Sequence, residues 1–167
     1  MITPMRIARL PEGRSLGEPM TAIATVCGVG LLPFAPGSWG ALIAMPFGWL
    51  LMLAGGWPML LAAAAAVSVA GWFAADWYVR ATGREDPPEI VIDEVAAQWL
   101  ALSVVPLTLK GYIIAYLVFR AFDTFKPWPA SWADSELKGG AGVMLDDLFA
   151  GAYSLLALLG LRCGGVI

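Results

Sequence analysis

Carboxylates are the most conspicuous chemically active side chains in this sequence. The chain has 13 Asp and Glu residues, 10 Lys and Arg residues and no histidine. Most of the acids gather in two polar segments, Asp76–Glu94 and Asp123–Asp147, within an otherwise apolar sequence. A carboxylate beside buried apolar helices is costly unless a cation neutralises it. These residue types favour a Mg²⁺ site that handles phosphate, because Mg²⁺ prefers oxygen ligands.

The lack of histidine and of motif-bearing cysteines excludes several other chemistries. A Ser-His-Asp triad and a histidine-dependent lipid phosphatase site are both impossible. Cys27 and Cys163 stand alone in apolar or terminal surroundings, which is typical of small reduced side chains rather than of a disulfide or a metal site. The sequence has no nucleotide-binding Gly-rich loop ending in Lys-Ser or Lys-Thr. It also has no basic patch, so we expect no nucleic-acid partner.

Two pairs of adjacent acids are the leading metal-ligand candidates: Asp93 with Glu94, and Asp146 with Asp147. Neighbouring side chains on a helix point about 100° apart, so the members of one pair need not share an ion. Either pair alone fits equally well the first turn of a helix, where negative charge is favourable. The membrane topology predicted below puts both pairs on the same side of the membrane, at the same depth. Two acidic pairs at one level favour the metal interpretation. Asp86 is a further predicted ligand.

Arg120, Asp123 and Lys126 are the predicted catalytic residues. Arg120 and Asp123 are three residues apart on one helix, which fits a structural salt bridge or a guanidinium that grips phosphate. Lys126 either adds positive charge to the site or faces solvent. Asp123 either orients the attacking water or binds the metal. Direct attack by an Asp, forming an acyl-phosphate, is the less favoured alternative.

Five residues are predicted to contact the substrate. Lys138 is a weaker phosphate candidate than Arg120 and Lys126, because it fits a headgroup-facing position equally well. The Gly-rich turn that follows it offers backbone N–H groups, which is weak evidence for phosphate binding. The predicted substrate contacts are Ser38, Asp134, Lys138, Gly139 and Gly140.

Composition predicts that these residues are held by membrane helices. The chain is 59% hydrophobic and only 14% charged, whereas soluble domains average about 25% charged residues. Pro19–Ala75 carries no charge, and it is long enough for two crossings of about 20 residues each.

The apolar stretches lack strand alternation, so we predict an all-α, multi-helix bundle embedded in the membrane. Residues 1–20, with Arg6, Arg9 and Arg14, are expected to form an N-terminal tail rather than a signal peptide, and residues 21–167 a single helical domain. Pro33–Gly40 and the Gly139–Gly142 stretch are expected to be loops. The expected helices are Gly40–Ala54 with a kink at Pro46, Met59–Ala75, Asp93–Val105, Tyr112–Phe125 and Asp146–Leu161.

If each helix crosses the membrane once, the tail and both polar segments fall on one side. That side holds most of the Arg and Lys, so it should be cytoplasmic. Lys110 and Arg162 are exceptions, and several helices are short for a crossing of about 17–25 residues. A helical bundle that sits in or on one leaflet is the alternative.

Three separated motifs, Gly28–Gly40, Asp86–Glu94 and Phe119–Gly151, resemble the phosphatidylglycerophosphatase A family. They occur in the family's order between about Thr21 and Gly160. The departures are small: Ser38 replaces a common Thr, and Ala97 a common Gly. The resemblance implies a bacterial, membrane-associated, Mg²⁺-dependent phosphatase. Together with the predicted topology, this leads us to expect the inner membrane, with the site facing the cytoplasm. Its substrate would be phosphatidylglycerol phosphate, held among membrane lipids and converted to phosphatidylglycerol.

Two other functions remain open from the residues alone. A transporter would also carry acids along its pathway, but here the acids lie at helix ends. A lipid synthase that transfers a phosphoalcohol also uses clustered Asp and Mg²⁺, but its spaced Asp-Gly-x-x-Ala-Arg pattern is missing. The sequence leaves the oligomeric state, the number of metal ions and the attacking group undetermined.

Overall fold

Helices form all the regular structure in residues 10–11 and 13–167, which the computed structural model describes. The all-α prediction is therefore confirmed. Arg6 and Arg9 of the predicted tail lie outside the described residues, whereas the Arg14 guanidinium stacks over the Trp77 ring at 5.2 Å. The elements are α1 (Pro19–Ala24), the 3₁₀ helix η1 (Val29–Leu31), α2 (Pro36–Thr82), α3 (Ile92–Leu102), α4 (Leu109–Phe125), α5 (Ala130–Glu136) and α6 (Gly139–Cys163).

Helix α2 contains both of the first two predicted helices, joined at a sharp bend. Gly56 alone departs from helical dihedral angles within it, with φ of 68°. Glycine adopts positive φ without steric cost, so the bend falls there. The dihedral angles at Pro46 are helical, and the kink expected there stays a prediction, because a proline can bend a helix without leaving those angles.

Both ends of α2 extend beyond the predicted boundaries. The helix begins at Pro36, a residue type that suits a first helical turn. It continues past Asp76, which pairs with Arg80 one turn later at 2.8 Å, so charge does not end the helix. Gly83 ends it instead, in the left-handed conformation with φ of 67°.

The second polar segment is also more helical than the sequence suggested. It contains α5, and α6 begins at Gly139 rather than at Asp146. A Cβ on Gly140 would lie 2.4 Å from the Trp72 carbonyl oxygen of α2. Glycine therefore permits close helix packing here and does not mark a loop.

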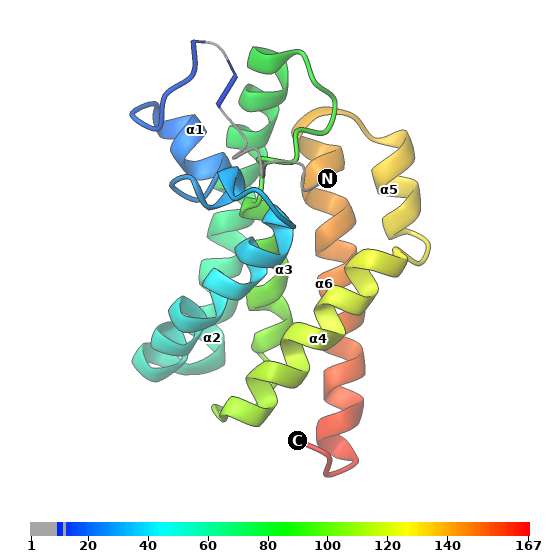
Figure 1. Cartoon of the computed structure of the whole chain (residues 1–167). Coiled ribbons are helices and arrows are strands. Elements are labelled where there is room, and N and C mark those ends of the chain that lie inside the picture. The colour runs from blue at the N-terminus through cyan, green and yellow to red at the C-terminus, as the bar shows by residue number, and fades with distance from the viewer. Residues whose placement is uncertain (1–9, 12) are drawn as a thin grey trace, which may run out of the picture.

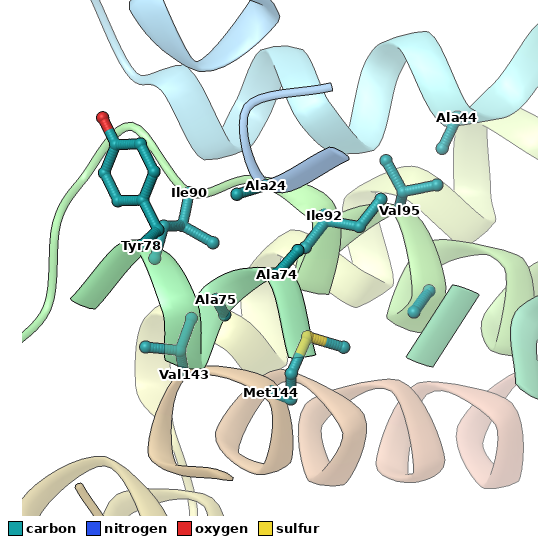
Figure 2. Packing of buried hydrophobic residues seen from close by; sticks show 11 residues of the cluster. Ala24, Ala44, Ala74, Ala75, Tyr78, Ile90, Ile92, Val95, Val143 and Met144 are labelled. Atoms are coloured by element: carbon teal, nitrogen blue, oxygen red, sulfur yellow. The ribbon is translucent and has the colours of Figure 1, made fainter. Parts of the chain in front are cut away.

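Helix α3 runs through the middle of the bundle between α2, α4 and α6 (Figure 1). Three of its side chains are buried alanines, Ala96, Ala97 and Ala101, which allow close approach of neighbouring helices. Figure 2 shows one of the two buried clusters, in which Ile92 and Val95 of α3 meet Ala74 of α2 and Met144 of α6. The two polar segments lie at the same end of the molecule, as predicted (Figure 1).

Two helices, α2 and α6, are long and apolar enough to cross a membrane. At about 1.5 Å per residue, the 25 residues of α6 extend about 37 Å, against a hydrocarbon core of about 30 Å. Helix α2 exposes large apolar side chains along its length, including Phe47, Leu50, Leu53 and Phe73. Helices α3 and α4 have only 11 and 17 residues, so the five-crossing topology stays a prediction.

Candidate active site

A polar pocket of about 290 Å³ lies where α2, α3, α4 and α6 meet. Its wall combines the first turn of α2, the Pro-rich loop before α3, the last turns of α4 and the third turn of α6. Six carboxylic acids but only two basic residues line it. The acids are Asp86, Asp93, Glu94, Asp123, Asp146 and Asp147, and the basic residues are Arg120 and Lys126.

Asp93, Glu94 and Asp147 form the tightest group of acids in the pocket. One carboxylate oxygen from each lies within 4.8 Å of the other two. The structure thus brings the adjacent residues Asp93 and Glu94 to one point, which the helical spacing did not require. Asp147 arrives from well inside α6, so its predicted alternative role as a first-turn acid is wrong.

A close contact between backbones holds these two helices in register. A Cβ on Gly151 of α6 would lie 2.9 Å from the Ala97 carbonyl oxygen of α3. Asp147 and Asp93 lie four residues earlier on their respective helices, which is about one turn. The two helices therefore run side by side in parallel. The contact between Gly151 and Ala97 fixes the separation of Asp147 and Asp93, which lie one turn closer to the helix N-termini.

The start of α2 closes the pocket against Glu94. A Cβ on Gly37 would fall 1.9 Å from Glu94 Oε1, so only glycine leaves room for this carboxylate. The next residue, Ser38, also lines the pocket. Its carbonyl oxygen accepts a hydrogen bond from the Tyr116 hydroxyl of α4 at 3.4 Å, which ties the pocket's α2 wall to α4.

Arg120 and Lys126 neutralise two other acids of the pocket, Asp123 and Asp146. Arg120 pairs with Asp123 at 2.5 Å, and Lys126 Nζ donates to both Asp146 and Asp134 at 2.6 Å. Burial by itself would lower the pKa of Lys126, but the hydrogen bonds to the two carboxylates outweigh it and raise the pKa. Lys126 therefore stays positively charged at neutral pH.

The Asp93, Glu94 and Asp147 group has no such neutralising partner among the described residues. Glu94 Oε2 and Asp147 Oδ2 are buried without a hydrogen-bond donor in that same part of the chain. Burial and the adjoining Glu94 charge raise the pKa of Asp93 well above its usual range. Two buried carboxylate oxygens without donors, beside the buried carboxylate of Asp93, suit a hard divalent cation, so the residues fit Mg²⁺.

The other predicted site residues lie at the pocket edge or outside it. Asp134 is half exposed and reaches the site only through Lys126. Lys138 pairs with Glu85 at 2.8 Å, and both side chains are exposed. Lys138 and Gly139 line a smaller adjoining pocket of about 130 Å³. The Gly140 N–H donates to Asp76 Oδ1 at 3.4 Å, and its contact with phosphate stays a prediction.

Gly37 and Gly151 are the structural determinants that the residue-by-residue reasoning missed. Both lie inside segments that carry the family resemblance, but a glycine in a sequence does not show which neighbour it approaches. The sequence did contain one signal for Gly151, because it stands four residues after Asp147 on the same predicted helix. Helical spacing alone places it below that acid.

Comparison with known proteins identifies the family of the chain. A sequence model of the phosphatidylglycerophosphatase A family matches residues 22–162. Phosphatidylglycerophosphatase A of Escherichia coli K12 is 33% identical over 140 residues, which cover 83% of this chain and 81% of its own length. The Haemophilus influenzae Rd protein of the same name is 30% identical over 149 residues, covering 89% of this chain and 91% of its own length.

A third relative carries a different name. It comes from Bacteroides thetaiotaomicron, is provisionally named a phosphatidylinositol-3-phosphatase, and is 37% identical over 142 residues. The match covers 81% of this chain and 89% of that protein. No solved structure matches the chain.

These matches define the protein class as a phosphoric monoester hydrolase. The chain belongs to the phosphatidylglycerophosphatase A family.

Proposed function

We propose that this protein hydrolyses the terminal phosphate monoester of phosphatidylglycerol phosphate, with Mg²⁺ as its cofactor. The observation that carries the proposal is the charge of the pocket, where six acids face two basic residues. An anionic phosphate would be repelled by this excess of acids. A divalent cation among the acids reduces the repulsion and gives the phosphate oxygens a positive partner, so a phosphatase at this site requires one.

Asp93, Glu94 and Asp147 are the residues that would hold the cation. Their oxygens lie within 4.8 Å of one another, and two of the three carboxylates have a buried oxygen without a donor. When bound there, Mg²⁺ supplies the charge that polarises the phosphoryl oxygens. Asp86 lines the same pocket and is the candidate for a further contact with the cation, outside the group of three carboxylates.

Arg120 and Lys126 would bind the terminal phosphate. Both line the pocket, and both are engaged with carboxylates there. Phosphoryl transfer depends mainly on positioning and on neutralising charge that spreads over the phosphoryl oxygens. The planar guanidinium of Arg120 can contact two of those oxygens at once. Ser38, at the first turn of α2, adds a hydroxyl at the edge of the same space.

Asp123 would orient and deprotonate the attacking water. Its side chain lies between Arg120, which it contacts, and the Asp147 carboxyl, which is its neighbour. In the reaction, the water oxygen bonds to phosphorus and its proton passes to Asp123. The bond from phosphorus to the glycerol oxygen breaks, and that oxygen takes a proton from solvent. The rival role for Asp123 is direct metal ligation.

We place the protein in the inner membrane of a bacterium, with the pocket at the cytoplasmic headgroup level. Exposed aromatic side chains flank the residues that line the pocket: Phe34 and Trp39 around the start of α2, and Phe125 beside Lys126. Aromatic side chains are favoured at the membrane interface. The lipid tails can thus stay in the bilayer while the phosphate enters the pocket.

Phosphate release from defined lipids tests the proposal. Purified protein in detergent micelles with Mg²⁺ should release inorganic phosphate from phosphatidylglycerol phosphate and leave phosphatidylglycerol. Phosphatidylinositol 3-phosphate and phosphatidic acid serve as competing substrates, and the Asp147→Asn variant as the inactive control. Faster hydrolysis of the inositol lipid would reassign the substrate. Release from none of the three, by protein that is folded and loaded with Mg²⁺, would refute the phosphatase proposal.

A further inference from the structure

Gln98 is a buried polar side chain that the proposed mechanism does not use. It lies in the middle of α3 and is fully buried. Neither its Nε2 nor its Oε1 has a hydrogen-bond partner among the described residues. Burying an amide without hydrogen-bond partners destabilises the folded state. A methionine of similar length would fill the same space without that cost.

The position of Gln98 on α3 points its amide toward the carboxylate group. Gln98 follows Glu94 by four residues, so the two side chains lie on the same helix face. Side chains on a helix lean toward its N-terminus, and the amide therefore extends over the turn that carries Glu94. On the other side, the next turn holds Ala101 and Leu102, both fully buried in apolar contacts.

Two complementary groups thus face each other across one helical turn. Glu94 Oε2 is a buried acceptor without a donor, and Gln98 Nε2 is a buried donor without an acceptor. Glu94 Oε1 is held on its other side against Gly37. We infer that Gln98 is a positioning residue, whose Nε2 donates to one buried water that in turn donates to Glu94 Oε2, and which thereby fixes the Glu94 carboxylate for cation binding.

This inference makes two separate claims. The contact between Gln98 and Glu94 concerns the fold alone. The effect on cation binding rests on the proposed function. Groups that hydrogen-bond to a metal ligand typically contribute about 10–100-fold to metal affinity or activity, whereas a merely structural amide would contribute nothing to either.

The experiment compares Gln98→Met with Ser154→Ala in the full-length protein. Ser154 is equally buried, but its hydroxyl donates to the Ala150 carbonyl of its own helix at 2.7 Å. Gln98→Met should leave the protein folded with a somewhat lower midpoint of thermal unfolding, because the buried Glu94 Oε2 loses its donor. It should also raise the Mg²⁺ concentration for half-maximal phosphate release by about tenfold or more, and shrink the rise in midpoint that Mg²⁺ produces. Ser154→Ala should leave both Mg²⁺ readouts within about twofold of wild type.

A double-mutant cycle isolates the contact from the activity. Thermal midpoints without Mg²⁺ are measured for Gln98→Met, Glu94→Gln and the double variant. Two residues in contact should give non-additive shifts, whereas independent residues give additive ones. Additive shifts, or an unchanged Mg²⁺ dependence in Gln98→Met, would overturn the inference even if the wild type is an active phosphatase. A non-additive cycle in a protein that releases no phosphate would instead retain the contact and reject the proposed function.

Discussion

Gly151 of α6 lies against the backbone of Ala97 of α3, one helical turn below the carboxylates of Asp147 and Asp93. This contact sets the distance between two predicted metal ligands that are far apart in the sequence. The site therefore depends on a packing contact that contains no functional group.

Gly151→Ala should disrupt the site through this contact. The new Cβ would meet the Ala97 carbonyl oxygen at 2.9 Å and its Cα at 3.1 Å, and backbone atoms cannot turn aside as a side chain can. We expect the helices to separate, with a loss of about 1–3 kcal/mol in stability from overpacking. A small displacement of catalytic groups can cost about a hundredfold in rate. Phosphate release and thermal unfolding measure the two effects.

Gly160→Ala is the matched control on the same helix. A Cβ at Gly160 meets no atom within 4 Å, and alanine is favoured over glycine in a helix by about 1 kcal/mol. This variant should be as active as wild type and slightly more stable. Equal activity of the two glycine variants would contradict the role assigned to the contact.

Gly37→Ala should separate activity from stability. Its Cβ would fall 1.9 Å from Glu94 Oε1, but this oxygen ends a flexible side chain that can swing away. We therefore expect a thermal midpoint close to that of wild type, together with a higher Mg²⁺ requirement and a rate lower by about tenfold or more. A variant with wild-type Mg²⁺ dependence would show that Glu94 is not a ligand.

Arg120 tests whether the site needs the shape of a guanidinium as well as its charge. Arg120→Lys keeps the positive charge but loses the two-point contact with phosphate, so phosphate release should still fall by about tenfold or more. Arg80→Lys, in the exposed pair with Asp76 on α2, is the control and should be neutral. Wild-type kinetics in Arg120→Ala would limit Arg120 to a structural pair with Asp123.

The two lysines of the second polar segment should behave differently. Lys126 lines the central pocket and bridges Asp134 and Asp146, so Lys126→Met should strongly lower phosphate release. Lys138 and its partner Glu85 are exposed, and exposed ion pairs contribute about 0–1 kcal/mol. Lys138→Met should therefore change kcat and KM less than about threefold. Steady-state kinetics of both variants test this difference. A larger effect at Lys138 than at Lys126 would indicate that the phosphate binds in the adjoining pocket.

The helical class and the residue types of the site could be predicted because they depend on composition and local pattern. Apolar runs without strand alternation predicted helices, and the lack of histidine limited the ligands to carboxylates. The grouping of Asp93, Glu94 and Asp147 could not be derived from spacing, because it depends on how α3 packs against α6.

The errors at helix boundaries have one physical cause. Glycines and charges were interpreted locally, as loop formers and helix ends. Gly140 instead allows α6 to approach α2, and Asp76 continues α2 by pairing with Arg80. Both effects depend on neighbours that a local pattern does not identify, so tertiary packing overrides the local preference.

The central claim is that the carboxylate group of α3 and α6 works through a divalent cation. The most direct measurement is phosphate release from phosphatidylglycerol phosphate by exhaustively chelated protein, followed as Mg²⁺ is added to wild type and to Asp147→Asn. The account predicts no release after chelation, recovery of the wild type with Mg²⁺, and little recovery of Asp147→Asn at the same concentrations. Full activity of the chelated wild type, or the same Mg²⁺ response in both proteins, would contradict it.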